Sequence, residues 1–317
     1  MPIQVVRGIP AAGAQACALT IGNFDGVHRG HQALLARVVA QAQRRSLVPA
    51  VLTFEPHPRE FFSPAAAPPR ISNVRDKIDA LAACGIRRVH VQHFDRGFAG
   101  LPPEDFISRA LVNGCAARWL IVGDDFRFGA GRRGDVAMLQ RHAARGDFEV
   151  ETAETVLDGD ERISSSAVRD ALLRGDLPRA HALLGRNYAV SGRVMHGAKL
   201  GRTIGFPTLN LRIPHRRPAA HGIFAVRVQG LGPAPLPGVA SIGIRPTIDD
   251  SGRWLLEVHL FDFAQQVYGR LVRVEFVARL RDEEKYASLD ELSAAIRNDA
   301  ARAREALAKA PLEPLEP

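Results

Sequence analysis

No run of about 18 apolar residues occurs in the sequence, so we expect no membrane-spanning helix. The N-terminus also lacks a charged segment followed by a long apolar stretch, which argues against a secretory signal. Only three cysteines occur, and none of them forms a C-x-x-C spacing, so neither a disulfide framework nor a zinc site is indicated. Together these absences predict a cytoplasmic protein.

Aromatic residues are scarce, at 6% of the chain, and no stretch alternates them with basic residues. A stacking platform for single-stranded nucleic acid is therefore not expected. The net charge is +8, carried mostly by arginine, and the basic residues are spread along the chain. Nucleic-acid binding is one reading of this charge, but an arginine-rich surface that takes small anionic substrates is favoured. We expect neither a nucleic-acid partner nor a membrane partner.

A chain of 317 residues is long for one hydrophobic core and sufficient for two domains. Its first part alternates strand-like and helical patterns, which is typical of a parallel, Rossmann-like sheet built from β-α-β units. The strand-like runs are 18–21, 51–54, 89–91 and 119–122, and the helical patterns are 74–84 and 103–113. In such a sheet ligands bind beyond the carboxyl ends of the strands. The low-complexity segment 63–70 is predicted to be a mobile surface loop.

Two further helical patterns, 164–174 and 177–184, precede Gly185, where we place the domain boundary. The predicted domains are 1–185 and 186–310, with a disordered tail at 311–317. Short strand-like segments separated by turn residues follow, and they predict a small closed β-barrel. These segments are 188–194, 223–228, 238–243, 255–261 and 272–277. A helical pattern from Leu289 to about Leu307 is expected to pack on the barrel.

The segment Gly22–His31 follows the first strand-like run and precedes a helical pattern at 32–39. The free N–H groups and the dipole at a helix start favour phosphate, and glycine lets the backbone approach a ligand closely. His28 and His31 form an H-x-G-H pattern, which resembles the signature of nucleotidyltransferases. We predict that both histidines stabilise charge on the phosphates of ATP, although a surface pair is the alternative. Further residues predicted to bind ATP here are Gly22, Asn23, Phe24, Asp25, Gly26 and Gly30, of which Asn23 and Asp25 have a structural alternative.

A run of three serines begins the helical pattern near residue 164. One reading is an ordinary N-cap with spare serines. The other reading is a phosphate site made by Ser164, Ser165 and Ser166, with Arg169 as a clamp. In combination with H-x-G-H, the segment Ile163–Arg169 resembles the second signature of the nucleotidyltransferase superfamily.

The segment Gly123–Asp135 is rich in glycine and charge. It is either an ordinary turn or a loop that contacts the second substrate. In the second case Phe54, Phe126 or Phe128 would offer a face to a flat ring.

The second half carries a glycine-rich loop at 197–210 that is not a Walker A motif. It is either a turn and strand or a phosphate loop formed by Lys199, Gly201, Arg202 and Gly205. Thr208 and Asn210 are two residues apart, so on a strand their oxygens point the same way, as suits Mg²⁺ carried with ATP. Glu257 interrupts an apolar strand-like run, where a carboxylate is either paired with an arginine or acts as a general base.

The order of these motifs over residues 15–305 resembles the prokaryotic bifunctional riboflavin kinase/FAD synthetase family. The resemblance implies a C-terminal barrel that phosphorylates riboflavin to FMN, and an N-terminal domain that transfers AMP from ATP to FMN. It implies that His28, His31 and Arg169 serve adenylyl transfer, and that Glu257 is the kinase base. The metal ligands would be Thr208 and Asn210. The implied flavin contacts are Phe54, Pro56, His57, Asp125, Phe126 and Phe128. Flavins would be substrates and products, so no tightly bound organic cofactor is expected besides Mg²⁺ with ATP.

Two places depart from the family pattern: Ile244 stands where a polar residue is usual, and the pair Asp124-Asp125 stands where some members have Asn. The main alternative is a chain with only one working activity. An RNA-binding or riboflavin-responsive regulator is a second alternative. A class I aminoacyl-tRNA synthetase also uses H-x-G-H, but it would normally need a K-M-S-K-S-like loop and a longer chain. The expected partners are ATP, riboflavin, FMN and FAD, and the sequence indicates no oligomeric state.

Overall fold

The computed structural model describes residues 2–11, 15–197, 201, 204–214, 217–244 and 254–310. The contacts divide the chain into two compact units. The first comprises residues 1–68 and 74–164, and the second comprises residues 69–73 and 165–317. Helices α7 (Ser165–Arg174) and α8 (Leu177–Leu184) are therefore counted with the second unit. The functional boundary at residue 185 stays a prediction.

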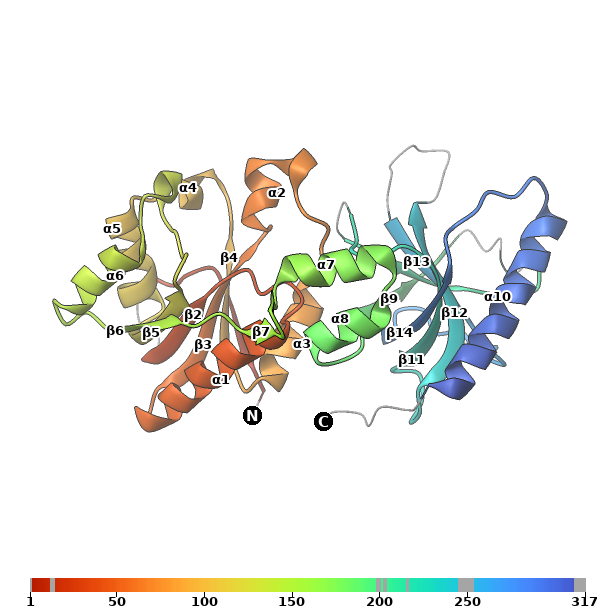
Figure 1. Cartoon of the computed structure of the whole chain (residues 1–317), viewed down its shortest axis with the longest axis horizontal. Coiled ribbons are helices and arrows are strands. Elements are labelled where there is room, and N and C mark those ends of the chain that lie inside the picture. Colours follow the sequence, from red (N-terminus) through yellow and green to blue (C-terminus); the bar gives the residue numbers. More distant parts are fainter. Residues whose placement is uncertain are drawn as a thin grey trace. The chain divides into compact units, whose positions relative to one another are not determined.

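The first unit is built on a six-stranded sheet in the order β1-β4-β3-β2-β5-β6 (Figure 1). Every neighbouring pair in it is parallel. The strands are β1 (Gln4–Arg7), β2 (Cys17–Ile21), β3 (Val48–Glu55), β4 (Arg88–His93), β5 (Ala117–Gly123) and β6 (Glu149–Ala153). The sequence patterns predicted the four inner strands but not the edge strands β1 and β6. Neither edge strand contains a buried residue, so both lack the apolar run that marks a buried strand.

Helices cover both faces of this sheet. Alternate residues of β2 belong to different core clusters, because successive side chains of a strand point to opposite faces. Ala18 packs with α1 (Arg29–Arg44) and α3 (Val74–Ala83). Leu19 packs with the π-helical segment η2 (Phe106–Gly114) and with α6 (Val136–Ala143). The shorter elements are α2 (Pro58–Phe62), η1 (Pro64–Ala66), α4 (Arg96–Ala99), α5 (Pro103–Asp105), η3 (Ala130–Arg132), β7 (Leu157–Asp158) and β8 (Glu161–Arg162).

The prediction of a surface loop over 63–70 is wrong at its end. Arg70 is 2% exposed, and its N–H donates to the carbonyl oxygen of Arg217 at 2.9 Å. The segment also contains η1. The low-complexity composition of this segment gave no sign that its last residue, Arg70, is buried.

The strand order places the candidate loops together. From β2 the chain moves outward to β3 and β4, and it then returns to β5 on the other side of β2. The carboxyl ends of β2 and β5 are therefore neighbours at the point where the direction reverses, which is where open α/β sheets bind ligands. Gly22–His31 follows β2, and Gly123–Asp135 follows β5.

The second unit is a closed antiparallel barrel in the order β10-β13-β12-β11-β14-β9, as predicted (Figure 1). Its strands are β9 (Ala189–Met195), β10 (Leu209–Arg212), β11 (Gly222–Gln229), β12 (Leu236–Ile244), β13 (Trp254–Leu260) and β14 (Leu271–Arg281). Phe224, Val258 and Phe276 are buried in it. The preceding helix α8 ends at Gly185, which adopts φ 71°, a conformation that glycine reaches without strain.

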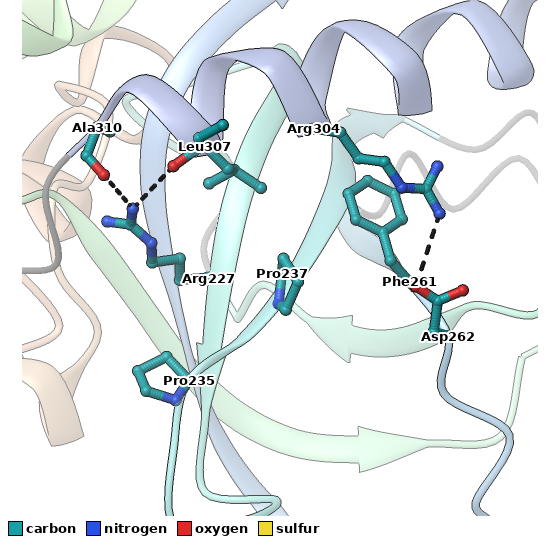
Figure 2. A pocket seen from close by; sticks show the side chains of 9 residues that line it. Arg227, Pro235, Pro237, Phe261, Asp262, Arg304, Leu307 and Ala310 are labelled. Carbon is teal, nitrogen blue, oxygen red and sulfur yellow. Dashed lines mark hydrogen bonds and ion pairs between the residues drawn. The ribbon is translucent and has the colours of Figure 1, made fainter.

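The C-terminal helix α10 (Leu289–Lys309), blue in Figure 1, packs on the outside of the barrel. Its Ala300 and Ala303 contact a cluster that includes Ala225 and Phe261. Figure 2 shows its C-terminal end, where Nη2 of Arg227 donates to the carbonyl oxygens of Leu307 and Ala310 at 3.3 and 2.7 Å. Within the described part of the chain, no helix has both the length and the apolar character required to span a membrane.

Candidate functional site

The loop after β2 has a constrained backbone. The N–H of Gly22 donates to the carbonyl oxygen of Leu52 at 3.1 Å, which extends β2 by one residue. Phe24 and Val27 then adopt φ 48° and 41°, the left-handed region that bulky residues rarely enter. Their side chains are 1% and 0% exposed, so core packing holds this conformation in place. A strained backbone persists only where the surrounding structure stabilises it, and such positions cluster at functional sites.

His28 and His31 lie together at the start of α1. Their rings stack with centroids 3.7 Å apart and an interplanar angle of 20°. His28 is the N-cap, and its Nδ1 accepts the N–H of His31 at 3.3 Å. Because Nδ1 acts as an acceptor, a neutral His28 carries its proton on Nε2, where it is a donor. The pair therefore presents imidazole N–H groups at a helix N-terminus, which suits an anionic ligand.

Gly30 allows the chain to pack closely against this pair. A Cβ at Gly30 would lie 3.2 Å from both Nδ1 of His28 and the carbonyl oxygen of Ile163. The first turn of α1 and the segment that ends in Ser164 are thus in close contact within the first unit. The remaining predicted residues of the serine motif, Ser165, Ser166 and Arg169, lie on α7 in the second unit.

Arg169 is 9% exposed, and its Nε donates to the carbonyl oxygen of Pro69 at 2.7 Å. This contact orients the guanidinium within the second unit. The predicted part of Arg169 in phosphate binding stays a prediction.

A buried lysine that the sequence reasoning missed supports the loop. Nζ of Lys77 on α3 donates to Oγ1 of Thr53 at 3.4 Å, and Oγ1 of Thr53 donates to the carbonyl oxygen of Asn23 at 3.2 Å. Lys77 is 2% exposed and Asp25 is 1% exposed. Oδ1 of Asn23 is buried and accepts no hydrogen bond from the described residues, so it is available to a ligand. A lysine within the helical pattern 74–84 was the only sequence signal for this relay.

A connected row of phenylalanine rings lies in the first unit. Phe54 contacts Phe94 and Phe98 with centroids 5.8 and 5.7 Å apart, and Phe94 contacts Phe62 at 5.6 Å. Phe62 is 64% exposed, so its ring offers a free face. The sequence reasoning missed both residues: Phe62 ends the short helix α2, and Phe94 directly follows β4, whose end was not among the strand ends considered for ligand binding.

The predicted flavin contacts differ in how much surface they offer. Phe128 is 5% exposed and lies against Gly134, where a Cβ would come within 2.5 Å of the ring. Phe126 stacks on Phe128 at 5.6 Å and is only partly buried. Asp125 is exposed and lies 3.9 Å from Arg162.

Pro56 and His57 connect β3 to α2. His57 forms a capping box: its Nδ1 accepts the N–H of Arg59 at 3.1 Å, and Oε2 of Glu60 accepts the N–H of His57 at 2.9 Å. The ring of His57 therefore has a structural task in addition to the predicted contact with flavin.

In the barrel, strand register brings the predicted kinase residues together. Asn210 on β10 is directly opposite Glu257 on β13, and Glu257 is directly opposite Ser241 on β12. Directly opposed residues of antiparallel strands share one face of the sheet. Along β13 the alternate residues Leu256, Val258 and Leu260 are buried, so Glu257 lies on the outer face. Thr208 immediately precedes β10.

Asn210 offers an oxygen that a cation could use. Oδ1 of Asn210 is buried and has no hydrogen-bond partner among the described residues. A Cβ at Gly197 would lie within 2.7 Å of the amide of Asn210, so only glycine leaves this amide its space. The N–H of Phe206 donates to the carbonyl oxygen of Gly201 at 2.7 Å, and Gly205 adopts φ 85°. Lys199, Arg202 and the side chain of Ile244 lie outside the described residues.

His259 was missed by the sequence reasoning. It is two residues after Glu257 on the same face of β13, and its Nδ1 donates to the carbonyl oxygen of Pro207 at 2.9 Å. Its ring also contacts Phe206 at 5.3 Å. His259 therefore holds the backbone just before Thr208. A histidine alternating with buried residues in a strand was its only sequence signal.

A hollow of about 520 Å³ lies beside the C-terminal end of α10. Figure 2 shows Arg227, Arg304 and Phe261 around it, with the guanidinium of Arg304 4.1 Å from the centre of the Phe261 ring. The described residues that line it include none of the predicted site residues.

Comparison with known proteins agrees with the two-part organisation. The family model described as FAD synthetase matches residues 11–167, and the model described as riboflavin kinase matches residues 184–307. A bifunctional riboflavin kinase/FMN adenylyltransferase of Escherichia coli (strain K12) is 47% identical over 306 residues, which cover 96% of this chain and 97% of that protein. The protein of the same description from Haemophilus influenzae (strain Rd) is 45% identical over 304 residues, covering 95% and 98%.

One similar solved structure is described as a macrolide-efflux protein from Streptococcus pneumoniae. It is 30% identical, has a TM-score of 0.75, and matches 95% of this chain and 99% of that chain. The likeness thus extends over both units. The predicted family and the predicted fold class are confirmed, and the chain belongs to the family of bifunctional riboflavin kinase/FMN adenylyltransferases.

Proposed function

We propose that residues 1–185 transfer AMP from ATP to FMN and that residues 186–310 phosphorylate riboflavin. The observation that carries this division is that the parallel sheet and the barrel each bring together a different pair of predicted catalytic or binding residues. The stacked pair His28 and His31 lies at the reversal point of the parallel sheet. The opposed pair Asn210 and Glu257 lies on the outer face of the barrel.

In adenylyl transfer, a phosphate oxygen of FMN attacks the α-phosphorus of ATP and pyrophosphate leaves. His28 and His31 donate N–H groups to the phosphates, where negative charge develops on the bridging and leaving oxygens. Gly22, Gly26 and Gly30 let the backbone approach these phosphates. The hydrogen bonds from Lys77 to Thr53 and from Thr53 to the carbonyl oxygen of Asn23 keep the loop after β2 in position. For Ser164, Ser165, Ser166 and Arg169, phosphate binding rests on the sequence signature.

We propose that the flavin ring packs against the phenylalanine row. Phe54 of this row is partly buried, and Phe62 at its end is exposed. Phe126, which stacks on Phe128, is also partly buried. An offset or edge-to-face contact with one of these rings would fix the plane of the isoalloxazine. The buried ring of Phe128 stacks on Phe126 and would hold Phe126 in position for this contact.

In the kinase reaction, the 5′-hydroxyl oxygen of riboflavin attacks the γ-phosphorus of ATP. Glu257 accepts the hydroxyl proton, and the ADP oxygen leaves. Mg²⁺ would be held by Oδ1 of Asn210 and Oγ1 of Thr208, and when bound it offsets charge on the phosphates. No group of three or more His, Cys, Asp or Glu that could hold a metal occurs among the described residues, which suits an ion that arrives with ATP and takes few protein ligands.

The test follows riboflavin, FMN and FAD by chromatography after addition of ATP and Mg²⁺. His31→Ala should make FMN normally and lose FAD formation by a hundredfold or more, on the order of the loss from removing one donor to a developing oxyanion. Glu257→Gln should make little FMN but should still convert added FMN to FAD. The matched controls are His142→Ala on α6 and the exposed Glu305→Gln on α10.

Several outcomes contradict the division. FAD formation at the normal rate by His31→Ala would remove the histidine pair from adenylyl transfer. FMN formation at the normal rate by Glu257→Gln would remove the proposed base. FMN without any FAD from the unmodified chain would favour the alternative of a single working activity.

The metal and the location are also part of the proposal. Chelation of divalent ions should stop both reactions, and Mg²⁺ should restore them. We place the chain in the cytoplasm, because none of Cys17, Cys84 and Cys115 forms a disulfide, as is usual in a reducing compartment. Its proposed partners are the small molecules of the two reactions.

A further inference from the structure

A hollow of about 700 Å³ lies in the first unit at the amino-terminal edge of the parallel sheet. It is lined by residues at the starts of β1, β3 and β4 and at the C-terminal end of α1, among them Gln4, Val48 and Arg88. Because all six strands are parallel, the Gly22–His31 loop belongs to the opposite edge. The hollow has the volume of a small-molecule site, and the proposed reactions make no use of it.

A buried arginine forms part of its wall. Arg88 is 5% exposed. Its Nε donates to Oε1 of Gln4 at 3.2 Å, and its Nη1 donates to the carbonyl oxygen of Gln15 at 2.7 Å. Both acceptors are neutral, so these bonds orient the guanidinium without compensating its charge.

No carboxylate of the described residues forms an ion pair with Arg88. The first unit's only other residues are Met1, Ala12, Gly13 and Ala14, whose side chains carry no acid. A buried charge without a counter-ion is costly. An arginine in that situation is a binding group for an anion, because its planar fork of donors matches carboxylate and phosphate oxygens.

Other basic groups add to the positive charge at this edge. Arg87 lines the same hollow. The positive charges of Arg88 and Arg118 both act on the thiol of Cys17 at the start of β2. The nearby acids Glu149 and Glu151 are already paired, with Arg45 at 2.6 Å and with Arg37 at 2.8 Å. The local field therefore favours a negative ligand.

The rest of the wall is mixed. Gln43 and Ser46 supply neutral polar groups, and Val39, Leu47 and Val48 supply apolar surface. A bare inorganic ion would leave this apolar surface unused. An organic molecule with one anionic group would use both kinds of wall.

We propose that this hollow binds a small organic anion, a molecule that carries a phosphate or carboxylate on an apolar body. Its anionic group pairs with Arg88, and its body contacts Val39 and Leu47. The site is separate from the two catalytic constellations, and the proposal does not depend on the division of activities between them.

The test is calorimetric titration of the full chain with phenyl phosphate and with benzoate. Binding of these probes at the catalytic sites is common to the unmodified chain and to the variants described below, so the difference between them reports binding in the hollow. Phenol and inorganic phosphate serve as the partial probes. Both anionic aromatic probes should bind more tightly than either partial probe, and the tighter of the two identifies the anionic group that the site prefers.

Three variants locate the binding. Arg88→Met should weaken the affinity roughly tenfold or more, because a charge-assisted hydrogen bond is lost. Gln43→Glu places a negative charge at an exposed position of the lining and should weaken it several-fold. Gln140→Glu makes the same change at an exposed position of α6, outside the lining, and should leave the affinity unchanged.

The proposal is overturned if the unmodified chain binds neither anionic probe. It is also overturned if Gln43→Glu binds them as tightly as Gln140→Glu does, a comparison that stands even where Arg88→Met fails to fold. Inorganic phosphate binding as tightly as phenyl phosphate would refute the apolar part of the site.

Discussion

Replacement of Asp299 by asparagine should loosen α10 from the barrel. Asp299 is 3% exposed and accepts two bonds from Arg281 of β14: from Nε at 2.9 Å and from Nη2 at 2.6 Å. The hydrogen bond to Asp299 is the main reason that the pKa of Arg281 is raised above its ordinary value. An asparagine of the same shape keeps one acceptor oxygen but turns an N–H group toward the guanidinium.

The cost can be worked out from these contacts. A hydrogen bond to a charged group contributes about 1.5–3 kcal/mol, and asparagine retains only one, to a neutral acceptor. The side chain of Arg281 is 18% exposed, and its Nη1 lies 3.8 Å from the carboxylate of Glu284, so its charge stays partly compensated. We therefore expect Asp299→Asn to lower the free energy of unfolding of the second unit by about 2–3 kcal/mol, less than for a fully buried pair.

Tryptophan fluorescence can isolate that unit. The chain has two tryptophans, Trp119 in β5 and Trp254 in β13. In a Trp119→Phe background only Trp254 reports, and the urea midpoint should fall by about 1 M for an m-value near 2 kcal/mol/M. Asp262→Asn is the control, because Asp262 is 92% exposed and lies 3.9 Å from Arg304. Equal midpoints for Asp299→Asn and Asp262→Asn would refute the reasoning.

Three further predictions concern buried or tethering groups. Burial lowers the pKa of His90 from 6.5 to about 4, so the unfolded chain takes up this proton at a higher pH than the folded chain does. The contribution of neutral His90 to the free energy of unfolding is therefore fully present above pH 6.5, and about 3 kcal/mol of it is lost by pH 4. Urea unfolding at pH 7 and pH 4.5 should show a smaller loss in His90→Phe, and an equal loss would exclude His90 as its source. Burial raises the pKa of Cys17 to about 12 and also raises that of Cys115, so at pH 8 only Cys84 should react quickly with DTNB, against three thiols in urea; three fast equivalents in the folded chain would contradict this. Arg227→Met removes the two hydrogen bonds to the carbonyl oxygens at the C-terminal end of α10, so hydrogen exchange of the amides of residues 305–310 should quicken roughly tenfold. Unchanged exchange would show that these two bonds do not hold the end of the helix.

Much of the fold could be read locally. The inner strands of the sheet, the helix stop at Gly185 and five of the six barrel strands follow from apolar period and turn residues over short windows, whereas β10 was not among the predicted strands. The edge strands β1 and β6 could not be read in this way, because an exposed edge strand needs no apolar run. The end of the segment 63–70 was misread for a related reason: Arg70 is buried by partners far away in the chain.

The candidate sites divide in the same way. The sequence by itself determined which groups could do the chemistry, since His28, His31 and Glu257 are marked by their motifs. Only the tertiary structure decided which groups meet. The register places Asn210 against Glu257 and brings His259 to the loop before Thr208. Strand register and burial come from contacts between residues far apart in the sequence, and no local pattern encodes those contacts.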